Sequence, residues 1–435
     1  MTQERASRRR RRLTATVTDL EVSIQRAFLV GVELPGMSTV DSERSLEELA
    51  LLTDTAGSEP VDHELVRRTR IDPATYIGSG KAEELATLTK AIDIDVVVFD
   101  NQLTPAQQRN LQKLFGCDVV DREGLILDIF AQHAHTKVGA LQVELAMNRY
   151  NLPRLRGKGT SLSQQGAGVL ARGPGETKLE TDRRRILQRI SKLERDLKET
   201  VGHRETQRKA RRRSEIPQVS IVGYTNAGKS TLLNALTDAG VLVEDRLFAT
   251  LDSTVRRLEL PNQRPVLLAD TVGFVRRLPH HLVEAFQSTL SEVAEADLLL
   301  HVVDGSVEDL AGQIAAVREV LLEIGAAELP ESIVFNKSDL IGDRGMGRLA
   351  NLYPDAVFVS ALTGSGLDEL LVRIGELVEK TMVTMTLEIP YTRGDLVAAV
   401  HRVGEVIEEK HDDNGTILEV RVPETSQARF AQFSR

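Results

Sequence analysis

Residues 219–236 read VSIVGYTNAGKSTLLNAL, and this stretch decides the fold. Its first residues are typical of a buried strand, and Leu232, Leu233 and Leu236 recur at helical spacing after a turn. Between strand and helix, residues 223–230 match the phosphate-loop pattern G-x-x-x-x-G-K-[ST]. A strand, a glycine-rich turn and a helix in this order predict a doubly wound, mostly parallel α/β sheet that binds a nucleotide.

The chemistry of phosphate binding explains the order of residues in this loop. Glycines allow backbone N–H groups to surround the phosphates, and the helix N-terminus adds positive potential. Lys229 is expected to reach the β- and γ-phosphates, and Ser230 to ligate Mg²⁺. The expected nucleotide contacts are Gly223, Tyr224, Thr225, Asn226, Ala227, Gly228, Lys229, Ser230 and Thr231.

The segment RPVLLADTVGF (264–274) is an apolar strand that ends in the pattern D-x-x-G. Asp270 should hold Mg²⁺ through water, and the N–H of Gly273 can sense the γ-phosphate, with Thr271 and Val272 beside the nucleotide. Phe274 follows, where many Ras-like GTPases carry the glutamine that orients the attacking water. A phenyl ring cannot do this, so we expect slow intrinsic hydrolysis; the alternative is that Phe274 is a core residue.

Two further fragments predict the base specificity. ELPESIVFNKSDL (328–340) ends in N-K-x-D, and the carboxylate of Asp339 can accept from the two donors of guanine, which adenine lacks. After one more strand, a backbone N–H near Ser360 can meet the guanine O6. The expected base contacts are Asn336, Lys337, Ser338, Asp339, Ser360, Ala361 and Leu362. Four fragments in this order predict a GTP-hydrolysing G domain.

The first switch should lie in DRLFATLDSTVRRLEL (245–260). Thr250 and Thr254 are both candidates for the second Mg²⁺ ligand, and their spacing from the phosphate loop does not choose between them.

Composition limits what the rest of the chain can be. A length of 435 residues indicates two to four domains, and the net charge of −9 excludes a uniformly basic nucleic-acid binder. The single cysteine, Cys117, excludes an intramolecular disulfide and a multi-cysteine zinc site. Because no apolar run reaches eighteen residues and no hydrophobic segment follows the N-terminal arginines, we expect no membrane span, no secretory signal and a cytoplasmic protein.

Shifts in sequence pattern divide the chain into five expected segments. They are a disordered basic arm (1–20), a small parallel α/β subdomain (21–120), two long antiparallel helices joined by a glycine-rich basic loop at about 152–176 (121–215), the G domain (216–382) and a small α+β unit of strand, helix, strand and helix (383–435).

The loop between the two helices is strongly basic. Residues 149–189 contain ten Lys and Arg residues against three acidic ones. A long basic loop favours an RNA contact, and the alternative is a solvated linker. The RNA-contact candidates are Arg154, Arg156, Lys158, Arg172, Lys178 and Arg183.

A second glycine-rich motif, GSGK at 78–81, is open to two interpretations. It could hold a second nucleotide, but it lacks the full phosphate loop, and a turn that opens a helix is the favoured interpretation.

Motifs distributed over residues 70–365 resemble the HflX family of translation-factor-like GTPases. They are GYTNAGKSTLLN, LFATLD, DTVGFVRRLPH, NKSD, GPGETKLETDRRRI, YIGSGKAEEL and VVVFDNQLTPAQQRNL. The resemblance implies that Thr250 is the switch threonine that binds Mg²⁺. It also places Phe248, Ala249, Leu251 and Asp252 at the nucleotide.

This resemblance further implies binding to the large ribosomal subunit and its RNA, with splitting or rescue of stalled ribosomes under stress. Lys229, Thr250, Gly273 and Phe274 would then form the catalytic group, with Mg²⁺ as cofactor, GTP as substrate, and the ribosome stimulating hydrolysis. We expect a monomer. Two alternatives stay open: a signalling GTPase with a protein partner, and a ribosome-assembly or RNA-remodelling factor that also uses ATP.

Overall fold

The computed structural model describes residues 24–155, 174–213, 216–237, 247–248, 250, 254–277, 279, 282–283, 286–380, 382–412, 414–423, 427 and 429–434. The chain divides into two compact units. The first comprises residues 1–198 with 246–248 and 278–285, and the second comprises the remainder. No helix in the described ranges is long and apolar enough to cross a membrane.

The first unit contains a four-stranded parallel sheet of order β2-β1-β3-β4, as the alternating pattern predicted. Its elements are β1 (Arg26–Glu33), α1 (Thr39–Thr55), β2 (Glu59–Arg67), α2 (Ser79–Ala91), β3 (Val96–Phe99), α3 (Pro105–Phe115) and β4 (Asp118–Asp121). The sequence patterns missed β2. It is an edge strand, and most of its residues are exposed, so it lacks an apolar run.

The helices that follow differ from the two long ones expected. The first of them was expected from a stripe of apolar residues that recur every three or four positions from Ile126 to Leu145. This stripe instead lies on two helices, α4 (Arg122–His133) and α5 (Lys137–Asn151), and the short 3₁₀ helix η2 (Leu152–Leu155) follows. Ala134 is extended, and the side chain of Thr136 caps α5 by accepting from the N–H of Gly139. The break therefore comes from a capping residue that an apolar stripe cannot reveal.

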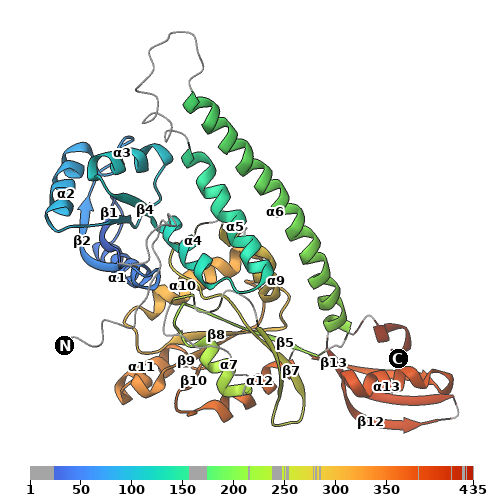
Figure 1. Ribbon diagram of the computed structural model, residues 1–435. Coiled ribbons are helices and arrows are strands. Elements are labelled where there is room, and N and C mark those ends of the chain that lie inside the picture. The colour runs from blue at the N-terminus through green and yellow to red at the C-terminus, as the bar shows by residue number, and fades with distance from the viewer. Residues whose placement is uncertain are drawn as a thin grey trace, which may run out of the picture. The chain divides into compact units, whose positions relative to one another are not determined.

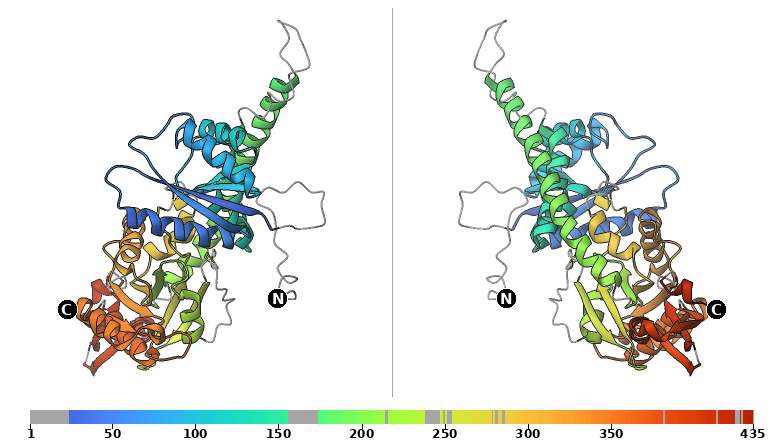
Figure 2. Two further views of the ribbon diagram at one scale, coloured as in Figure 1. Left: turned by 90° about the vertical axis from the view of Figure 1, so that its left-hand side faces the viewer. Right: turned by 90° about the vertical axis from the view of Figure 1, so that its right-hand side faces the viewer.

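The second helix was expected from an apolar stripe between Ile186 and Leu197, and it is a single long helix, α6 (Pro174–Arg213), which runs beside α5 in Figures 1 and 2. Leu145 on α5 packs with Ile190 and Leu193 on α6. Arg189 also forms an ion pair with Glu144, and Arg149 with Glu194. Apolar residues of the two stripes thus pack together between α5 and α6.

The second unit contains a six-stranded sheet of order β10-β9-β8-β5-β7-β6, in which only the β6–β7 pair is antiparallel. Its elements are β5 (Gln218–Gly223), α7 (Lys229–Thr237), β6 (Thr254–Glu259), β7 (Pro265–Asp270), α9 (Gln287–Ala294), β8 (Leu298–Asp304), α10 (Leu310–Glu323), β9 (Glu331–Asn336), η3 (Ser338–Leu340), α11 (Asp343–Leu352), β10 (Val357–Phe358) and α12 (Leu367–Lys380). The doubly wound, mostly parallel fold is confirmed. Because such strands are buried on both faces, their sequences show almost no alternation of apolar and polar residues.

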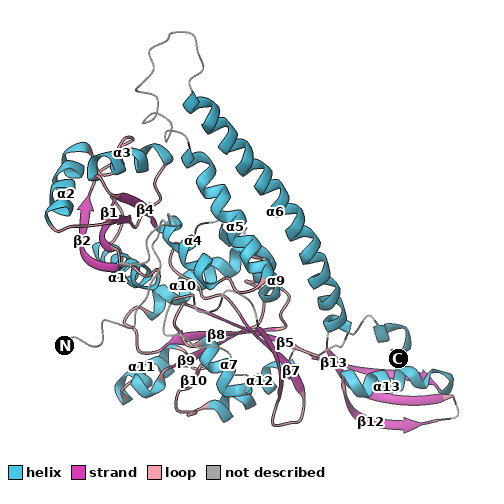
Figure 3. Cartoon of the chain, viewed as in Figure 1, coloured by secondary structure: helices cyan, strands magenta, loops and turns pink. Residues whose placement is uncertain are grey.

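The last segment forms a small α+β domain, coloured by secondary structure in Figure 3. Its elements are β11 (Met382–Pro390), η4 (Tyr391–Arg393), α13 (Gly394–Val403), β12 (Glu405–His411), β13 (Gly415–Pro423) and η5 (Ala431–Phe433), with strand order β11-β13-β12. The expected order of strand, helix, strand and helix was wrong in one respect, because β12 and β13 form a hairpin. The carboxylate of Asp412 closes its turn by accepting from the N–H groups of Asn414 and Gly415.

Candidate nucleotide-binding site

The phosphate loop joins β5 to α7, and close packing explains its glycines. A Cβ on Gly223 would lie 2.1 Å from the carbonyl oxygen of Val302, and one on Gly228 would lie 2.2 Å from the side-chain nitrogen of Asn336. Asn226 adopts a left-handed conformation with φ of 59°. The backbone therefore turns sharply here, and only glycine fits at its two closest approaches.

Lys229 is buried at the start of α7. Its Nζ donates to the carbonyl oxygen of Tyr224 at 2.8 Å. Burial lowers the pKa of this lysine to about 8, although the nearby Asp270 acts in the opposite direction. A desolvated ammonium group next to backbone N–H groups is suited to bind an anionic phosphate.

Three oxygen-bearing side chains meet beside Lys229. The hydroxyl of Ser230 lies 2.6 Å from Oδ2 of Asp270 and 2.7 Å from the hydroxyl of Thr250, which donates to the same Oδ2 at 3.1 Å. Thr254 instead pairs with Asp270 through the backbone ladder of β6 and β7. The structure thus brings Thr250 to the group, in line with the family resemblance.

This group fits Mg²⁺. All of its donors are oxygens, the atoms that Mg²⁺ prefers, and Mg²⁺ commonly keeps several of its waters. Oδ1 of Asp270 is buried without a hydrogen-bond partner, as expected of an atom that faces a hydrated cation. Burial also raises the pKa of Asp270 above the ordinary value. Ser230 and Thr250 would hold the ion directly, with Asp270 behind its water shell.

The segment that follows Asp270 lies against the phosphate loop. The N–H of Phe274 donates to the carbonyl of Gly223 at 3.1 Å, and the N–H of Thr225 donates to the carbonyl of Phe274 at 2.8 Å. Phe274 is 1% exposed, so in this conformation its ring is a core residue, which is the alternative that the sequence left open. A Cβ on Gly273 would lie 3.0 Å from Nζ of Lys229, so the backbone of Gly273 is well placed beside the phosphate-binding lysine.

The residues expected to read the base meet at the ends of β9 and β10. Asn336 donates to the carbonyl of Ala227 at 2.8 Å and accepts from the N–H of Ala361 at 3.0 Å, so it ties the phosphate loop to the base end. Asp339 is exposed and can accept from a guanine. Lys337 forms an ion pair with Asp304 at 2.7 Å. Ser338 and Ser360 are held by hydrogen bonds of their own loops, and Leu362 is exposed.

Several predicted nucleotide contacts lie elsewhere or cannot be placed. Phe248 belongs to the first unit, where its ring packs edge-on against Phe130 with centroids 4.7 Å apart, so the structure does not group it with the phosphate loop. The hydroxyl of Thr271 is buried and donates to the carbonyl of Ile221 at 2.7 Å, which is a structural contact. Ala249, Leu251 and Asp252 fall outside the described residues.

Sequence patterns missed a set of contacts that hold residues 274–276, just after Gly273, against neighbouring elements. The hydroxyl of Tyr224 accepts from the N–H of Arg276 at 2.7 Å, and the Arg276 side chain pairs with Asp309. Asp309 also caps α10. Asp304, the partner of Lys337, is the last residue of β8. Ligand-binding residues gather at the carboxyl edge of a parallel sheet. This position was the only feature of the sequence that could have identified Asp304 as a residue of the site.

The RNA-contact candidates require one correction. Arg154 lies in η2, and its guanidinium donates to Gln108, Leu103, Tyr150 and Asp121, so it is a structural residue rather than an available cation. Arg183 is exposed on α6. Arg156, Lys158, Arg172 and the side chain of Lys178 fall outside what the structure describes. The GSGK motif opens α2, and its Lys81 pairs with Glu64 and Glu84, which favours the turn interpretation.

Four family models match successive parts of the chain. They are the GTP-binding GTPase N-terminal region (residues 43–131), the GTP-binding GTPase middle region (133–211), the 50S ribosome-binding GTPase (218–337) and the HflX C-terminal domain (346–432).

Curated relatives match the chain over nearly its full length. GTPase HflX of Caldanaerobacter subterraneus subsp. tengcongensis is 46% identical over 94% of both chains. GTPase HflX of Escherichia coli K12 is 43% identical over 87% of this chain and 89% of its own length. Among solved structures, a GTP-binding protein from Sulfolobus solfataricus in complex with GDP is 27% identical, covers 81% of this chain and 98% of its own, and has a TM-score of 0.42.

Proposed function

Because this chain belongs to the HflX family of GTPases, we propose that it is a GTP-driven switch that binds the large ribosomal subunit and separates or rescues stalled ribosomes. GTP hydrolysis follows from family membership. The match of residues 218–337 to the 50S ribosome-binding GTPase model carries the proposal of a ribosomal partner. Splitting or rescue is the family function that the resemblance implies.

The geometry supports specific roles for the chain's own residues in hydrolysis. Lys229 and the N–H groups of the phosphate loop bind the β- and γ-phosphates, and Asp339 selects guanine. When bound by Ser230 and Thr250, Mg²⁺ supplies positive charge that stabilises the phosphates in the transition state. The contact between Ser230, Thr250 and Asp270 is the single observation that best supports this site.

Water activation is the step that Phe274, the residue after Gly273, does not supply. Phe274 is buried and its phenyl ring can neither donate nor accept a hydrogen bond. We therefore propose that hydrolysis is slow in the free protein and that the ribosomal subunit completes the site. This follows the general rule that switch GTPases accelerate when a partner supplies or positions the missing group.

Co-sedimentation with purified large ribosomal subunits tests the partner. The protein loaded with a non-hydrolysable GTP analogue should pellet with the subunits, and the GDP form should pellet less. If neither form pellets, the ribosomal proposal fails and a protein-partner signalling GTPase becomes the better explanation.

Charge neutralisation tests the role of the basic segment. Replacing Arg156, Lys158 and Arg172 with alanine should weaken subunit binding, with a smaller dependence on salt, and leave hydrolysis by the free protein unchanged. The matched control replaces three exposed lysines, Lys90, Lys192 and Lys198, and should bind normally. Equal loss of binding in both variants would show that overall charge, and not this segment, drives the interaction.

A further inference from the structure

A groove in the first unit is lined by residues other than those of the nucleotide site. Its cavity volume is about 890 Å³, and its walls come from α3, β4, α4, α5, η2 and the side chain of Ile186 on α6. Apolar side chains line part of it, namely Val120, Leu127, Met147, Leu155 and Ile186. The groove is large enough for a group the size of a nucleotide.

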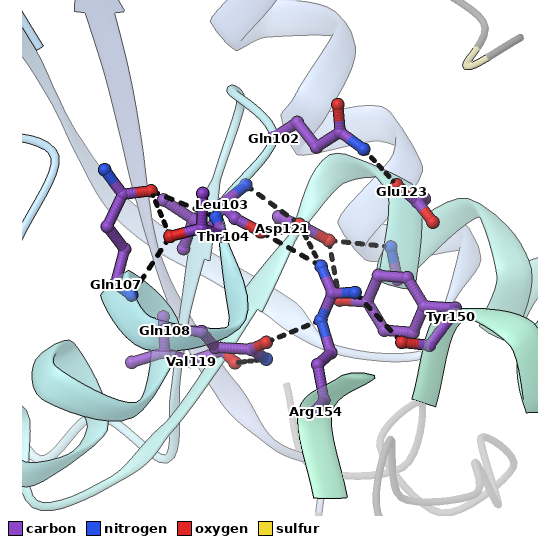
Figure 4. A network of polar contacts seen from close by, with 11 residues as sticks. Gln102, Leu103, Thr104, Gln107, Gln108, Val119, Asp121, Glu123, Tyr150 and Arg154 are labelled. Atoms are coloured by element: carbon purple, nitrogen blue, oxygen red, sulfur yellow. Dashed lines mark hydrogen bonds and ion pairs between the residues drawn. The ribbon is translucent and has the colours of Figure 1, made fainter. Parts of the chain in front are cut away.

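One wall of the groove is a rigid cation–aromatic stack (Figure 4). The guanidinium carbon of Arg154 lies 3.4 Å from the ring centroid of Tyr150, and both residues line the groove. Arg154 donates to the side chain of Gln108 at 2.8 Å and to the carbonyl oxygens of Tyr150 and Leu103 at 2.9 and 3.0 Å. These bonds use most of its donors, so the planar group is fixed before any ligand arrives.

A buried carboxylate holds both residues of this wall in place. Asp121 is fully buried and accepts from the Tyr150 hydroxyl at 2.7 Å and from Arg154 at 3.0 Å. A Cβ on Gly124 would lie 2.7 Å from the Tyr150 hydroxyl, so only glycine lets the tyrosine occupy this place. The wall is therefore preorganised, and binding a ligand costs little side-chain entropy there.

The charged residues around the groove indicate the ligand. Arg109 and the exposed Lys113 on α3 are cations that suit a phosphate. Asp118 and Asp128 add carboxylates to the lining, of which Asp128 already accepts from the side chain of Gln132; a carboxylate has further acceptor positions for an exocyclic amino group. Apolar surface beside a planar stack suits a heterocyclic base, whereas an acyl chain would leave these polar groups without partners.

The position of the groove in the chain favours RNA as the source of that nucleotide. Residues Leu152–Leu155 and helix α6, which both contribute to the groove, are the two segments that flank residues 156–173. The sequence between them contains Arg156, Lys158 and Arg172 and no acidic residue. Leu155, which lines the groove, is thus followed directly in the sequence by this basic segment.

We propose that this groove binds one unpaired nucleotide of an RNA strand, with its base on the apolar floor beside the Tyr150–Arg154 stack and its phosphate near Arg109 and Lys113. This inference rests on the proposed ribosomal function and names the contact that the first unit makes with RNA. Contact with an apolar floor carries little sequence specificity, because every base has a flat face.

Photo-crosslinking of the full-length protein to a single-stranded ten-nucleotide RNA containing 4-thiouridine tests the proposal without any mutation. Mass spectrometry should place crosslinks in peptides that contain Lys113, Met147 or Tyr150. Crosslinks that map only outside the groove would overturn the proposal. So would uridine monophosphate that competes as strongly as the RNA, because the groove would then be a site for free nucleotides.

Two variants measure the affinity contribution. Met147→Trp fills the groove, and Lys113→Glu reverses a charge at its rim; each should weaken binding of the labelled RNA roughly tenfold. Lys90→Glu, a charge reversal on α2, is the matched control and should change affinity less than twofold. A Tm within a few degrees of the original protein shows that each variant is folded. Unchanged affinity in both groove variants would contradict the proposal.

The two proposals fail in different ways. If the GTP-analogue form pellets with large subunits but the RNA does not crosslink to the groove, the ribosomal function stands and the groove inference is wrong. If the protein does not pellet with subunits in either nucleotide state, the ribosomal function is wrong whatever the crosslinks show.

Discussion

Two buried aspartates, one in each unit, occupy equivalent places at the carboxyl end of a parallel strand and differ in how completely they are bonded. Asp121 ends β4, and both of its oxygens accept hydrogen bonds, from the N–H groups of Leu103 and Gly124 and from Tyr150 and Arg154. Asp270 ends β7, and only Oδ2 is bonded, whereas Oδ1 is buried without a partner.

This difference separates a structural carboxylate from a functional one. A fully bonded buried carboxylate has no capacity left for a ligand, so its bonds can only hold the fold together. An incompletely bonded one lowers stability until a cation or hydrated ion approaches, and the raised pKa of Asp270 reflects that cost. The predicted effects of substitution therefore differ in kind, with catalysis affected at one site and stability at the other.

The largest effect is expected from Asp270→Asn. Single-turnover hydrolysis of saturating Mg·GTP should fall by about 10²- to 10³-fold, because the amide organises the hydrated cation poorly. The free energy of unfolding should change little, since removing the desolvated charge of Asp270 offsets the loss of its attraction to Lys229. Asp343→Asn, at an exposed position on α11, is the control for hydrolysis. A clear loss of stability without a loss of hydrolysis would show that Asp270 is a structural residue and not a functional one.

The converse effect is expected from Asp121→Asn. The free energy of unfolding of the first unit should fall by about 3 kcal/mol, because Arg154 loses its buried anionic partner. Hydrolysis by the free protein should not change. Urea titration, with hydrogen exchange to assign the unit that opens, provides the measurement. Asp62→Asn, on the exposed edge strand β2, should have almost no effect on stability. A drop in GTP turnover for Asp121→Asn would show that Asp121 is not a purely structural residue.

Ligand binding should stabilise only one of the two sites. Mg·GDP at a hundred times its Kd is expected to add about 2.7 kcal/mol to the stability of the second unit. Amide exchange should slow in the phosphate loop and around Asp270, and should not change around Asp121. Chelation of Mg²⁺ should remove part of the effect. Equal protection of both aspartates would mean that the Asp121 group also responds to the nucleotide.

A smaller effect is expected from Tyr150→Phe, which removes one of the four donors to Asp121. The cost should be about 1 kcal/mol in the free energy of unfolding, the usual contribution of one hydrogen bond. Tyr353→Phe, in the second unit, is the comparison variant. A cost above 3 kcal/mol would mean that the hydroxyl holds more of the structure than its single bond suggests.

The sequence predicted the G domain well because its constraints are local. The phosphate loop, Asp270 and Asn336 each follow a buried strand directly, so residue type and spacing alone define their positions. The edge strand β2 was missed because exposed residues carry no apolar period. The break between α4 and α5 depends on one capping hydroxyl, at Thr136, which lies within a continuous apolar stripe.

Contacts between distant residues explain the other differences. Arg154 appeared to belong to a basic loop, yet its partners Leu103 and Asp121 lie 51 and 33 residues away in sequence. The burial of Phe274 depends on how its backbone pairs with Gly223 and Thr225. The sequence alone left open whether its ring is a core residue or part of the catalytic group. The bonding of Asp121 and Asp270 could not be inferred either, since each simply ends an apolar strand.

GTP turnover of the full-length protein, measured with and without purified large ribosomal subunits, tests the proposed switch most directly. With Phe274 buried, the free protein should hydrolyse GTP slowly, at about 10⁻² s⁻¹ or below, and the subunits should raise the rate at least tenfold. Fast turnover without subunits, or a rate that subunits do not change, would contradict the proposal that the ribosomal subunit completes the catalytic site.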